Sequence, residues 1–272
     1  MKTKHLIFVA LIVICFPVVA QDKTVSKEKT VVTEKYLVGF SIGPCIPIGD
    51  FGSTDVHNSN AGLAKTGAIF DVSFVYKFNK NFGISALMRG QSNPVDAQVI
   101  ADGFAASMTV GSGVVTTKTS AWSAGYYMAG YYGAFPITEK LSVESRAMIG
   151  FANATSPMLN LNVKSGTSSV EVDQSAKNAF AFSYLFGVGF KLNVGKKRMY
   201  LAANIDYAGA KPEFRNVPIT ALSSSNVSSI SKTSFSQSFE SINIGFGVGW
   251  RFEGKSASAK ASKKVDNIDD YR

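Results

Sequence analysis

The chain has 272 residues and a formal net charge of +9, yet only 17% of its residues are charged and 12% are aromatic. So many aromatic residues with so little charge argue against a disordered chain. Two cysteines and two histidines are too few for a disulfide framework or a His/Cys metal cluster, so we predict no metal and no cofactor. The net positive charge leaves nucleic acid and anionic lipid as candidate partners.

The first predicted element is a cleaved secretory signal peptide at residues 1–20. Basic residues at the start precede a 15-residue apolar run, Leu6–Ala20, which is too short for a membrane-spanning helix. Cys15 raises a lipoprotein alternative, but Ile14 stands where the lipidation motif needs a small residue. Because the chain is exported, nucleic acid is not expected as a partner.

Residues 21–35 are short, charged and mixed in sign, which predicts a flexible periplasmic lead-in. From residue 36 onward apolar and polar residues alternate with the period of two that is typical of strands. Eight such runs follow one another, at 36–47, 67–78, 82–92, 119–135, 141–155, 177–194, 199–214 and 238–252. Long gaps lie at 48–66, 93–118, 156–176 and 215–237, and short gaps lie at 79–81, 136–140 and 195–198. No segment shows a helical period.

The last run separates its two faces clearly. One face is large and apolar, with Ile242, Ile244, Phe246, Val248, Trp250 and Phe252. The other face is rich in glycine and small polar residues, which suit the crowded interior of a narrow barrel. The large residues then meet lipid, and a sheet in lipid must close. We therefore predict an all-β fold, an eight-stranded antiparallel up-and-down transmembrane β-barrel over residues 36–253. If the apolar faces pointed inward, the protein would instead be a water-soluble carrier.

Charged residues on the polar faces predict a paired network that fills the lumen, because a buried charge without a partner is costly. A three-residue turn at 79–81 places Asp71 opposite Arg89, and a four-residue turn at 195–198 places Lys191 opposite Ala202. The predicted lumenal network is Asp71, Lys77, Arg89, Glu144, Arg146, Lys191, Asp206 and Arg251. The run at 119–135 has aromatic residues on both faces, so its orientation is left open.

Export places the N-terminus in the periplasm, so the short gaps are predicted periplasmic turns and the four long gaps extracellular loops. The serine-rich gap at 215–237 is a predicted mobile loop, and residues 254–272 are a predicted flexible periplasmic tail. Aromatic residues at the strand ends predict a girdle at the periplasmic membrane interface, made of Tyr36, Tyr76, Phe78, Phe82, Trp250 and Phe252.

Basic residues gather at the same end of the predicted barrel, at Lys77, Lys80, Lys140, Lys196, Lys197, Arg198, Lys255 and Lys260. One interpretation is a rim that meets phospholipid head groups, and the other is a set of ordinary solvated turns.

The segment Gly247-Val248-Gly249-Trp250-Arg251-Phe252 resembles the last-strand signal of the small outer-membrane β-barrel domain proteins of Gram-negative bacteria. The resemblance implies that Gly247, Trp250 and Phe252 are read by the barrel-assembly machinery during insertion. It also implies residence in the outer membrane among lipopolysaccharide and phospholipid. Two features depart from the pattern, since Gly245 replaces a polar residue and about 20 residues follow the signal.

Three functions are compatible with this sequence. We predict a non-enzymatic barrel that acts structurally or binds a surface ligand of unknown identity through its extracellular loops. The first alternative is a narrow porin-like channel or transporter for small or apolar solutes, although eight strands leave room mainly for side chains. The second is an enzyme that modifies lipid A, for which His57 with Asp55 is the candidate base. Glu144 near Arg146 also resembles a catalytic acid with a charged partner, but an ion pair inside the lumen explains the two residues more simply.

Overall fold

A computed structural model describes residues 34–107, 114–194, 198–223 and 228–253. The predicted signal peptide, most of the lead-in and the predicted tail lie outside these residues. No helix in the described part is both long and apolar enough to cross a membrane.

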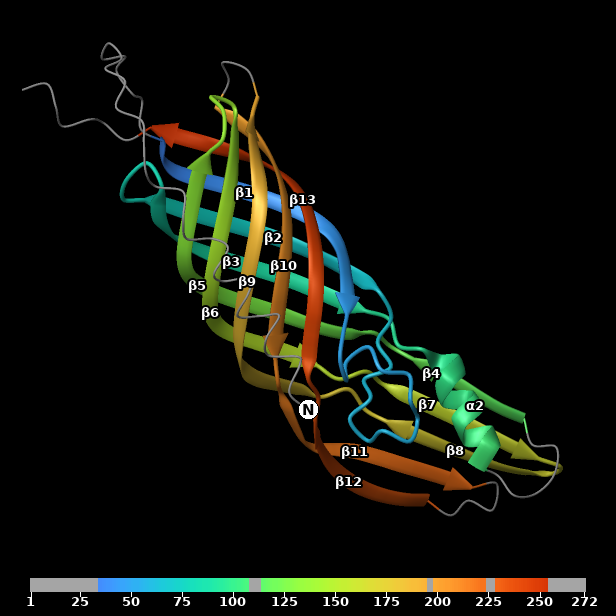
Figure 1. Cartoon of the computed structure of the whole chain (residues 1–272). Coiled ribbons are helices and arrows are strands. Elements are labelled where there is room, and N and C mark those ends of the chain that lie inside the picture. Colours follow the sequence, from blue (N-terminus) through green and yellow to red (C-terminus); the bar gives the residue numbers. More distant parts are fainter. Residues whose placement is uncertain (1–33, 108–113, 195–197, 224–227, 254–272) are drawn as a thin grey trace, which may run out of the picture. The chain divides into compact units, whose positions relative to one another are not determined.

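Eight strands close into a barrel in the order β1-β13-β10-β9-β6-β5-β3-β2, with every neighbouring pair antiparallel (Figure 1). Their bounds are β1 Glu34–Pro47, β2 Gly67–Lys77, β3 Phe82–Asn93, β5 Trp122–Pro136, β6 Leu141–Thr155, β9 Asn178–Asn193, β10 Met199–Ala210 and β13 Phe239–Glu253. Each barrel strand pairs with the next one along the chain, and β13 closes on β1. The predicted eight-stranded up-and-down barrel is therefore confirmed.

The short turns set the register as predicted. In the first hairpin the Phe78 amide donates to the Phe82 carbonyl at 2.9 Å, and Asp71 lies opposite Arg89. In the hairpin of β9 and β10, Lys191 lies opposite Ala202. Because side chains alternate between faces, a slip of one residue would move every charged side chain of a strand into lipid.

The outer wall of the barrel is apolar, and the inner wall carries the small and charged residues. Phe182 and Phe246 on the outer wall are 58% and 61% exposed, whereas Leu185 on the inner wall is fully buried. The faces therefore point as predicted, and the water-soluble alternative is wrong. In β5 the even-numbered residues point inward, so Tyr126 is buried while Tyr127 is 57% exposed.

Replacing Val188 by arginine tests this assignment directly. Val188 lies midway along the outer wall of β9 and is 51% exposed, so we expect a loss of about 2–4 kcal/mol in the free energy of unfolding. The measurement is urea unfolding of the protein in lipid vesicles. Ile230→Arg, a change at an exposed residue outside the barrel wall, serves as control and should cost less than about 0.5 kcal/mol. Equal losses in both variants would contradict a lipid-facing position for Val188.

Three of the four long gaps contain more regular structure than predicted. The gaps at 93–118, 156–176 and 215–237 supply the strands of a second sheet in the order β12-β11-β8-β7-β4, here called the loop sheet. Its strands are β4 Val114–Thr119, β7 Leu159–Ser165, β8 Ser168–Gln174, β11 Glu213–Ser223 and β12 Ser228–Ser236, and helix α2 spans Ala97–Ser107. The prediction that no segment is helical was wrong, because the 11-residue α2 lies inside a gap and its apolar residues at helical spacing, Ala97, Ile100, Ala101 and Phe104, were overlooked. The prediction of a loop at 215–237 was also wrong, since serine-rich β12 pairs with β11 there.

The loop sheet continues the barrel wall. Each of its strands lies next in sequence to a barrel strand, and the order β12-β11-β8-β7-β4 repeats the order β13-β10-β9-β6-β5 (Figure 1). Leu161 on β7 and Val217 on β11 are buried, as inward-facing residues of the wall would be. A bulge at Asn216, with φ of 55°, lets both Phe214 and Val217 face inward. Helix α2 packs beside β4 at one edge of the sheet.

Candidate functional site

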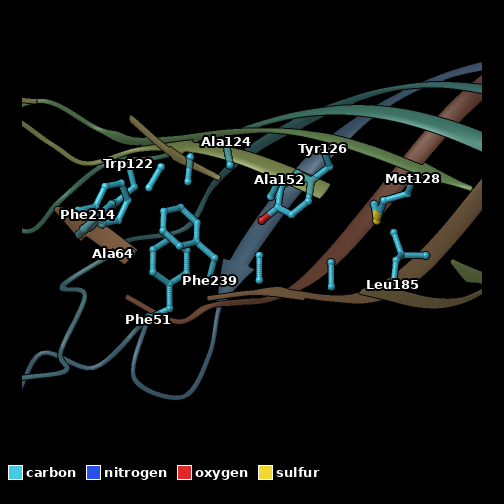
Figure 2. Packing of buried hydrophobic residues seen from close by; sticks show 14 of the residues in the cluster. Phe51, Ala64, Trp122, Ala124, Tyr126, Met128, Ala152, Leu185, Phe214 and Phe239 are labelled. Atoms are coloured by element: carbon cyan, nitrogen blue, oxygen red, sulfur yellow. The ribbon is translucent and has the colours of Figure 1, made fainter. Parts of the chain in front are cut away.

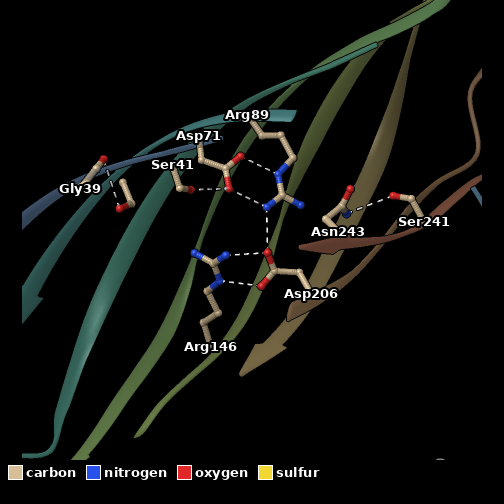
Figure 3. A network of polar contacts seen from close by, with 9 residues as sticks. Gly39, Ser41, Asp71, Arg89, Arg146, Asp206, Ser241 and Asn243 are labelled. Atoms are coloured by element: carbon tan, nitrogen blue, oxygen red, sulfur yellow. Dashed lines mark hydrogen bonds and ion pairs between the residues drawn. The ribbon is translucent and has the colours of Figure 1, made fainter. Parts of the chain in front are cut away.

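The centre of the lumen is crossed by four charged side chains, here called the charge quartet: Asp71, Arg89, Arg146 and Asp206 (Figure 3). Arg89 on β3 donates from Nε and Nη2 to both carboxylate oxygens of Asp71, at 2.7 and 2.6 Å. Its Nη2 also donates to Asp206 at 2.8 Å. Because β3 and β10 lie on opposite sides of the barrel, this contact spans the lumen.

Arg146 completes the quartet from β6. Its Nε and Nη2 donate to the two carboxylate oxygens of Asp206, at 2.8 and 2.5 Å. The side chains of Arg89 and Asp206 are 0% exposed and that of Arg146 is 13% exposed. Two acids and two bases balance, which is what a buried charged cluster needs. The quartet crosses the lumen with paired charges and carries no net charge itself.

A second charged cluster lies at the turn end of the barrel, where the short hairpin turns are. Glu34 is at its centre and pairs with Arg251, with Lys191 at 3.3 Å and with Lys77 at 4.0 Å. Glu144 accepts a hydrogen bond from Tyr132 and lies 3.7 Å from Lys191. The eight predicted residues thus divide between two clusters, and Glu144 and Arg146 belong to different ones.

Glu34 is the acid that sequence analysis missed, because it was assigned to the lead-in. Strict alternation would also place it outside with Tyr36. A register shift between Glu34 and Tyr36 turns its side chain toward the lumen instead. Between the two clusters lies a cavity of about 40 Å³, with Ser41, Ser73 and Arg146 in its wall. It has room for a few water molecules and no more.

At the loop end the lumen is closed by an aromatic plug, defined as Phe51, Trp122, Phe214 and Phe239 (Figure 2). Phe51 stacks on Phe239 with ring centroids 4.6 Å apart, and Trp122 contacts the rings of Phe239 at 5.4 Å and Phe214 at 5.9 Å. The Trp122 indole donates to the Gly62 carbonyl at 2.8 Å. Sequence analysis missed the plug, because Phe51 lies in a gap and only the closed barrel brings these residues together.

The aromatic residues of the predicted girdle lie together at the turn end. Tyr36 and Tyr76 have ring centroids 5.4 Å apart, and Tyr76 and Phe78 have theirs 5.5 Å apart. Phe82 contacts Phe135, a further exposed aromatic residue that the prediction omitted. Phe252 is 44% exposed. A membrane interface at this level stays a prediction.

The residues of the predicted insertion signal lie on β13. Gly247 is on the inner wall opposite Ser41, and Trp250 is on the outer wall, 38% exposed, with its ring 6.2 Å from Phe40. Recognition of these residues and of Phe252 by the assembly machinery stays a prediction.

The predicted basic rim is only partly described. Lys77 is 8% exposed and pairs inside the lumen, so it does not belong to a surface rim. Lys80, Lys140 and Arg198 are exposed at the turn end. The remaining predicted members, Lys196, Lys197, Lys255 and Lys260, lie outside the described residues.

The outer face of the loop sheet combines polar contacts with exposed apolar side chains. Asn160 donates to Glu171 at 2.7 Å and to Asp173 at 2.6 Å. Ile230 is 75% exposed and Leu222 is 42% exposed, and the register of β11 and β12 places them on one face. On the exposed part of β11, the Arg215 guanidinium donates to Glu213 at 2.7 Å and lowers the pKa of that carboxyl.

The candidate catalytic residues do not form a catalytic arrangement. His57 is exposed, and Asp55 accepts a hydrogen bond from the backbone amide of His57 at 2.9 Å, which is a turn contact. Within the described ranges no group of three or more His, Cys, Asp or Glu side chains could hold a metal ion.

No family model and no curated protein matches this chain. Among solved structures, the chain is similar to the attachment invasion locus protein Ail of Yersinia pestis, with 13% identity, coverage of 80% of this chain and 97% of that one, and a TM-score of 0.38. It is similar to Neisserial surface protein A, with 13% identity, coverage of 81% and 98%, and a TM-score of 0.37. A major outer membrane protein from Thermus thermophilus is 8% identical, with coverage of 80% and 99% and a TM-score of 0.42.

These likenesses are too low to carry an argument about role, and the fold rests on the strand pairing of the chain itself. By its closed barrel and its lipid-facing wall, the chain is an outer-membrane-type β-barrel.

Proposed function

We propose that this outer-membrane barrel is a non-enzymatic anchor that binds an extracellular ligand through its loop sheet. The observation that carries the proposal is the contrast between a closed lumen and an ordered surface beyond it. The charge quartet and the aromatic plug occupy the lumen at two levels, whereas three of the four long gaps supply five paired strands. Lipopolysaccharide and phospholipid around the barrel wall, and the assembly machinery during insertion, are the other proposed partners.

The filled lumen disfavours the channel alternative. Arg89 and Asp206 are fully buried, so an ion would have to displace paired charges to pass. We therefore expect no conductance steps above background when the protein is inserted into a planar bilayer in potassium chloride. Discrete steps in that recording would support the channel instead.

The loop sheet has the properties of a binding surface. Paired strands hold side chains in fixed positions, which reduces the entropy lost on binding. Large apolar side chains that stay exposed outside the membrane mark interaction sites. Ile230 and Leu222 form such a pair, with Lys232 on the same face of β12. A protein ligand with an apolar contact and an acidic group suits this face.

The test compares two aspartate variants on β12. Ile230→Asp places a charge in the apolar pair, whereas Ser231→Asp adds the same charge on the opposite face of the strand. Cells that display the protein are applied to a surface coated with serum proteins. We expect Ile230→Asp to reduce adherence about tenfold and Ser231→Asp to leave it unchanged. Equal adherence of wild type and Ile230→Asp, with the barrel folded in both, would overturn the proposal.

A further inference from the structure

A belt of buried polar side chains lies in the lumen between the charge quartet and the aromatic plug. Gln91, Asn93, Ser241 and Asn243 are at most 4% exposed, and Tyr126 is fully buried. These residues lie on β3, β5 and β13, so the belt reaches around much of the wall. On the side toward the hairpin turns, the belt is bounded by Arg89 of the charge quartet.

Part of the belt is satisfied by its own members, and these contacts fix the orientation of the amides. The Gln91 amide nitrogen donates to the Asn93 oxygen at 2.9 Å, and the Asn93 nitrogen donates to the carbonyls of Cys45 and Lys65 at 3.2 and 2.9 Å. The Asn243 nitrogen donates to Ser241 at 3.1 Å. The side-chain oxygens of Gln91 and Asn243 therefore take no part in these hydrogen bonds.

Four buried atoms of the belt have no hydrogen-bond partner among the described residues: Arg89 Nη1, Gln91 Oε1, Tyr126 Oη and Asn243 Oδ1. Strand pairing places them near one another, since Arg89 is opposite Tyr126 and Asn243 is opposite Asp206, which Arg89 contacts. Figure 3 shows Asn243 on the side of the Arg89 guanidinium that is turned away from Arg146. Arg89 Nη1 is a donor and Tyr126 Oη can donate or accept. The amide oxygens of Gln91 and Asn243 are acceptors.

Charge decides what kind of molecule can join these atoms. The quartet is neutral, because Arg89 and Arg146 balance Asp71 and Asp206. An anion at Arg89 Nη1 would bring an uncompensated charge into the barrel, and a cation would be repelled by the guanidinium. A neutral molecule that both donates and accepts satisfies all four atoms, and the small molecule with those properties is water.

We propose that the belt is an internal hydration site, in which ordered water molecules bridge Arg89 and Tyr126 to Gln91 and Asn243. The wall residues paired with the belt are small, since Ala124 lies opposite Gln91, Ala152 opposite Tyr126 and Ala208 opposite Ser241. The site lies between two closures, so its water exchanges slowly with the outside. This inference is independent of the ligand proposed for the loop sheet, and the experiment below does not involve that ligand.

Tyr126→Phe tests the proposal by the sign of its effect on stability. If water bonds the hydroxyl, its removal loses a hydrogen bond, and the unfolding equilibrium constant in urea rises about fivefold. If the hydroxyl is dry and unpartnered, its removal relieves a buried polar group, and that constant falls. Tyr127→Phe is the matched control, because Tyr127 is the adjacent tyrosine on the lipid-facing wall. We expect Tyr127→Phe to leave the constant within about twofold of wild type.

A second experiment detects the bound water directly. Water-edited solid-state NMR of the protein in lipid bilayers should show magnetisation transfer from water to the Tyr126 ring and the Asn243 amide in wild type. Transfer to Asn243 should weaken in Tyr126→Phe. A stabilised or unchanged Tyr126→Phe variant, or no transfer to either residue in wild type, would overturn the hydration site.

Discussion

Asp206→Ala is expected to lower the free energy of unfolding by about 3–5 kcal/mol, one of the two largest effects of any single change described for this barrel. Asp206 accepts hydrogen bonds from two arginines, and its side chain is 0% exposed. Removing it leaves the part-buried Arg146 guanidinium without its carboxylate partner. The measurement is urea unfolding in lipid vesicles, followed by tryptophan fluorescence and by heat-modifiable gel migration.

The control for Asp206→Ala is a double variant that removes a whole pair. Asp206→Leu with Arg146→Met leaves Arg89 bonded to Asp71 and keeps the remaining part of the quartet neutral, so its loss in the free energy of unfolding should be clearly smaller. Asp102→Ala removes an exposed carboxylate on α2 and should change stability by less than about 0.5 kcal/mol. A double variant as unstable as Asp206→Ala would show that packing, and not charge balance, sets the cost.

Trp122→Ala is the second large change. We expect it to lower the free energy of local opening at the aromatic plug by about 3–5 kcal/mol. It removes three ring contacts and the hydrogen bond to Gly62. Cys45 is fully buried on the inner wall and reports whether the plug opens. In a Cys15→Ser background, we expect labelling of Cys45 by a small thiol reagent to be more than about a hundredfold faster in the variant.

Trp250→Ala is the matched control, because Trp250 is the other tryptophan and lies on the lipid-facing wall. It should leave the labelling rate of Cys45 within about twofold of wild type. If both tryptophan variants labelled equally fast, the plug would not be the closure that protects the lumen.

The barrel could be predicted from the sequence because its determinants are local. Alternation separates Phe182 from Leu185, and two short turns fix Asp71 against Arg89 and Lys191 against Ala202. Neighbouring strands follow one another along the chain, so few topologies compete. The apolar outer wall follows from residue size alone, since glycine and serine fit a narrow interior.

What could not be predicted depends on contacts across the lumen or on departures from strict alternation. The bond from Arg89 to Asp206 joins opposite strands, and a sequence pattern does not say which levels of the wall face each other. Glu34 turns inward only because the register shifts at the start of β1. The plug unites Phe51 with Phe239 although most of the barrel separates them along the chain. The loop sheet is missed because β4, β7 and β8 are short and β12 is serine-rich.

The connections between the loop sheet and the barrel have a mechanical consequence. Only Lys211 and Pro212 separate β10 from β11, and only Gln237 and Ser238 separate β12 from β13. Segments of two residues cannot act as a flexible tether. A ligand that pulls on the sheet therefore loads the embedded strands directly, along their length and in shear, where many backbone hydrogen bonds share the force. Force applied to the loop sheet is therefore expected to meet no flexible segment before it reaches the barrel strands.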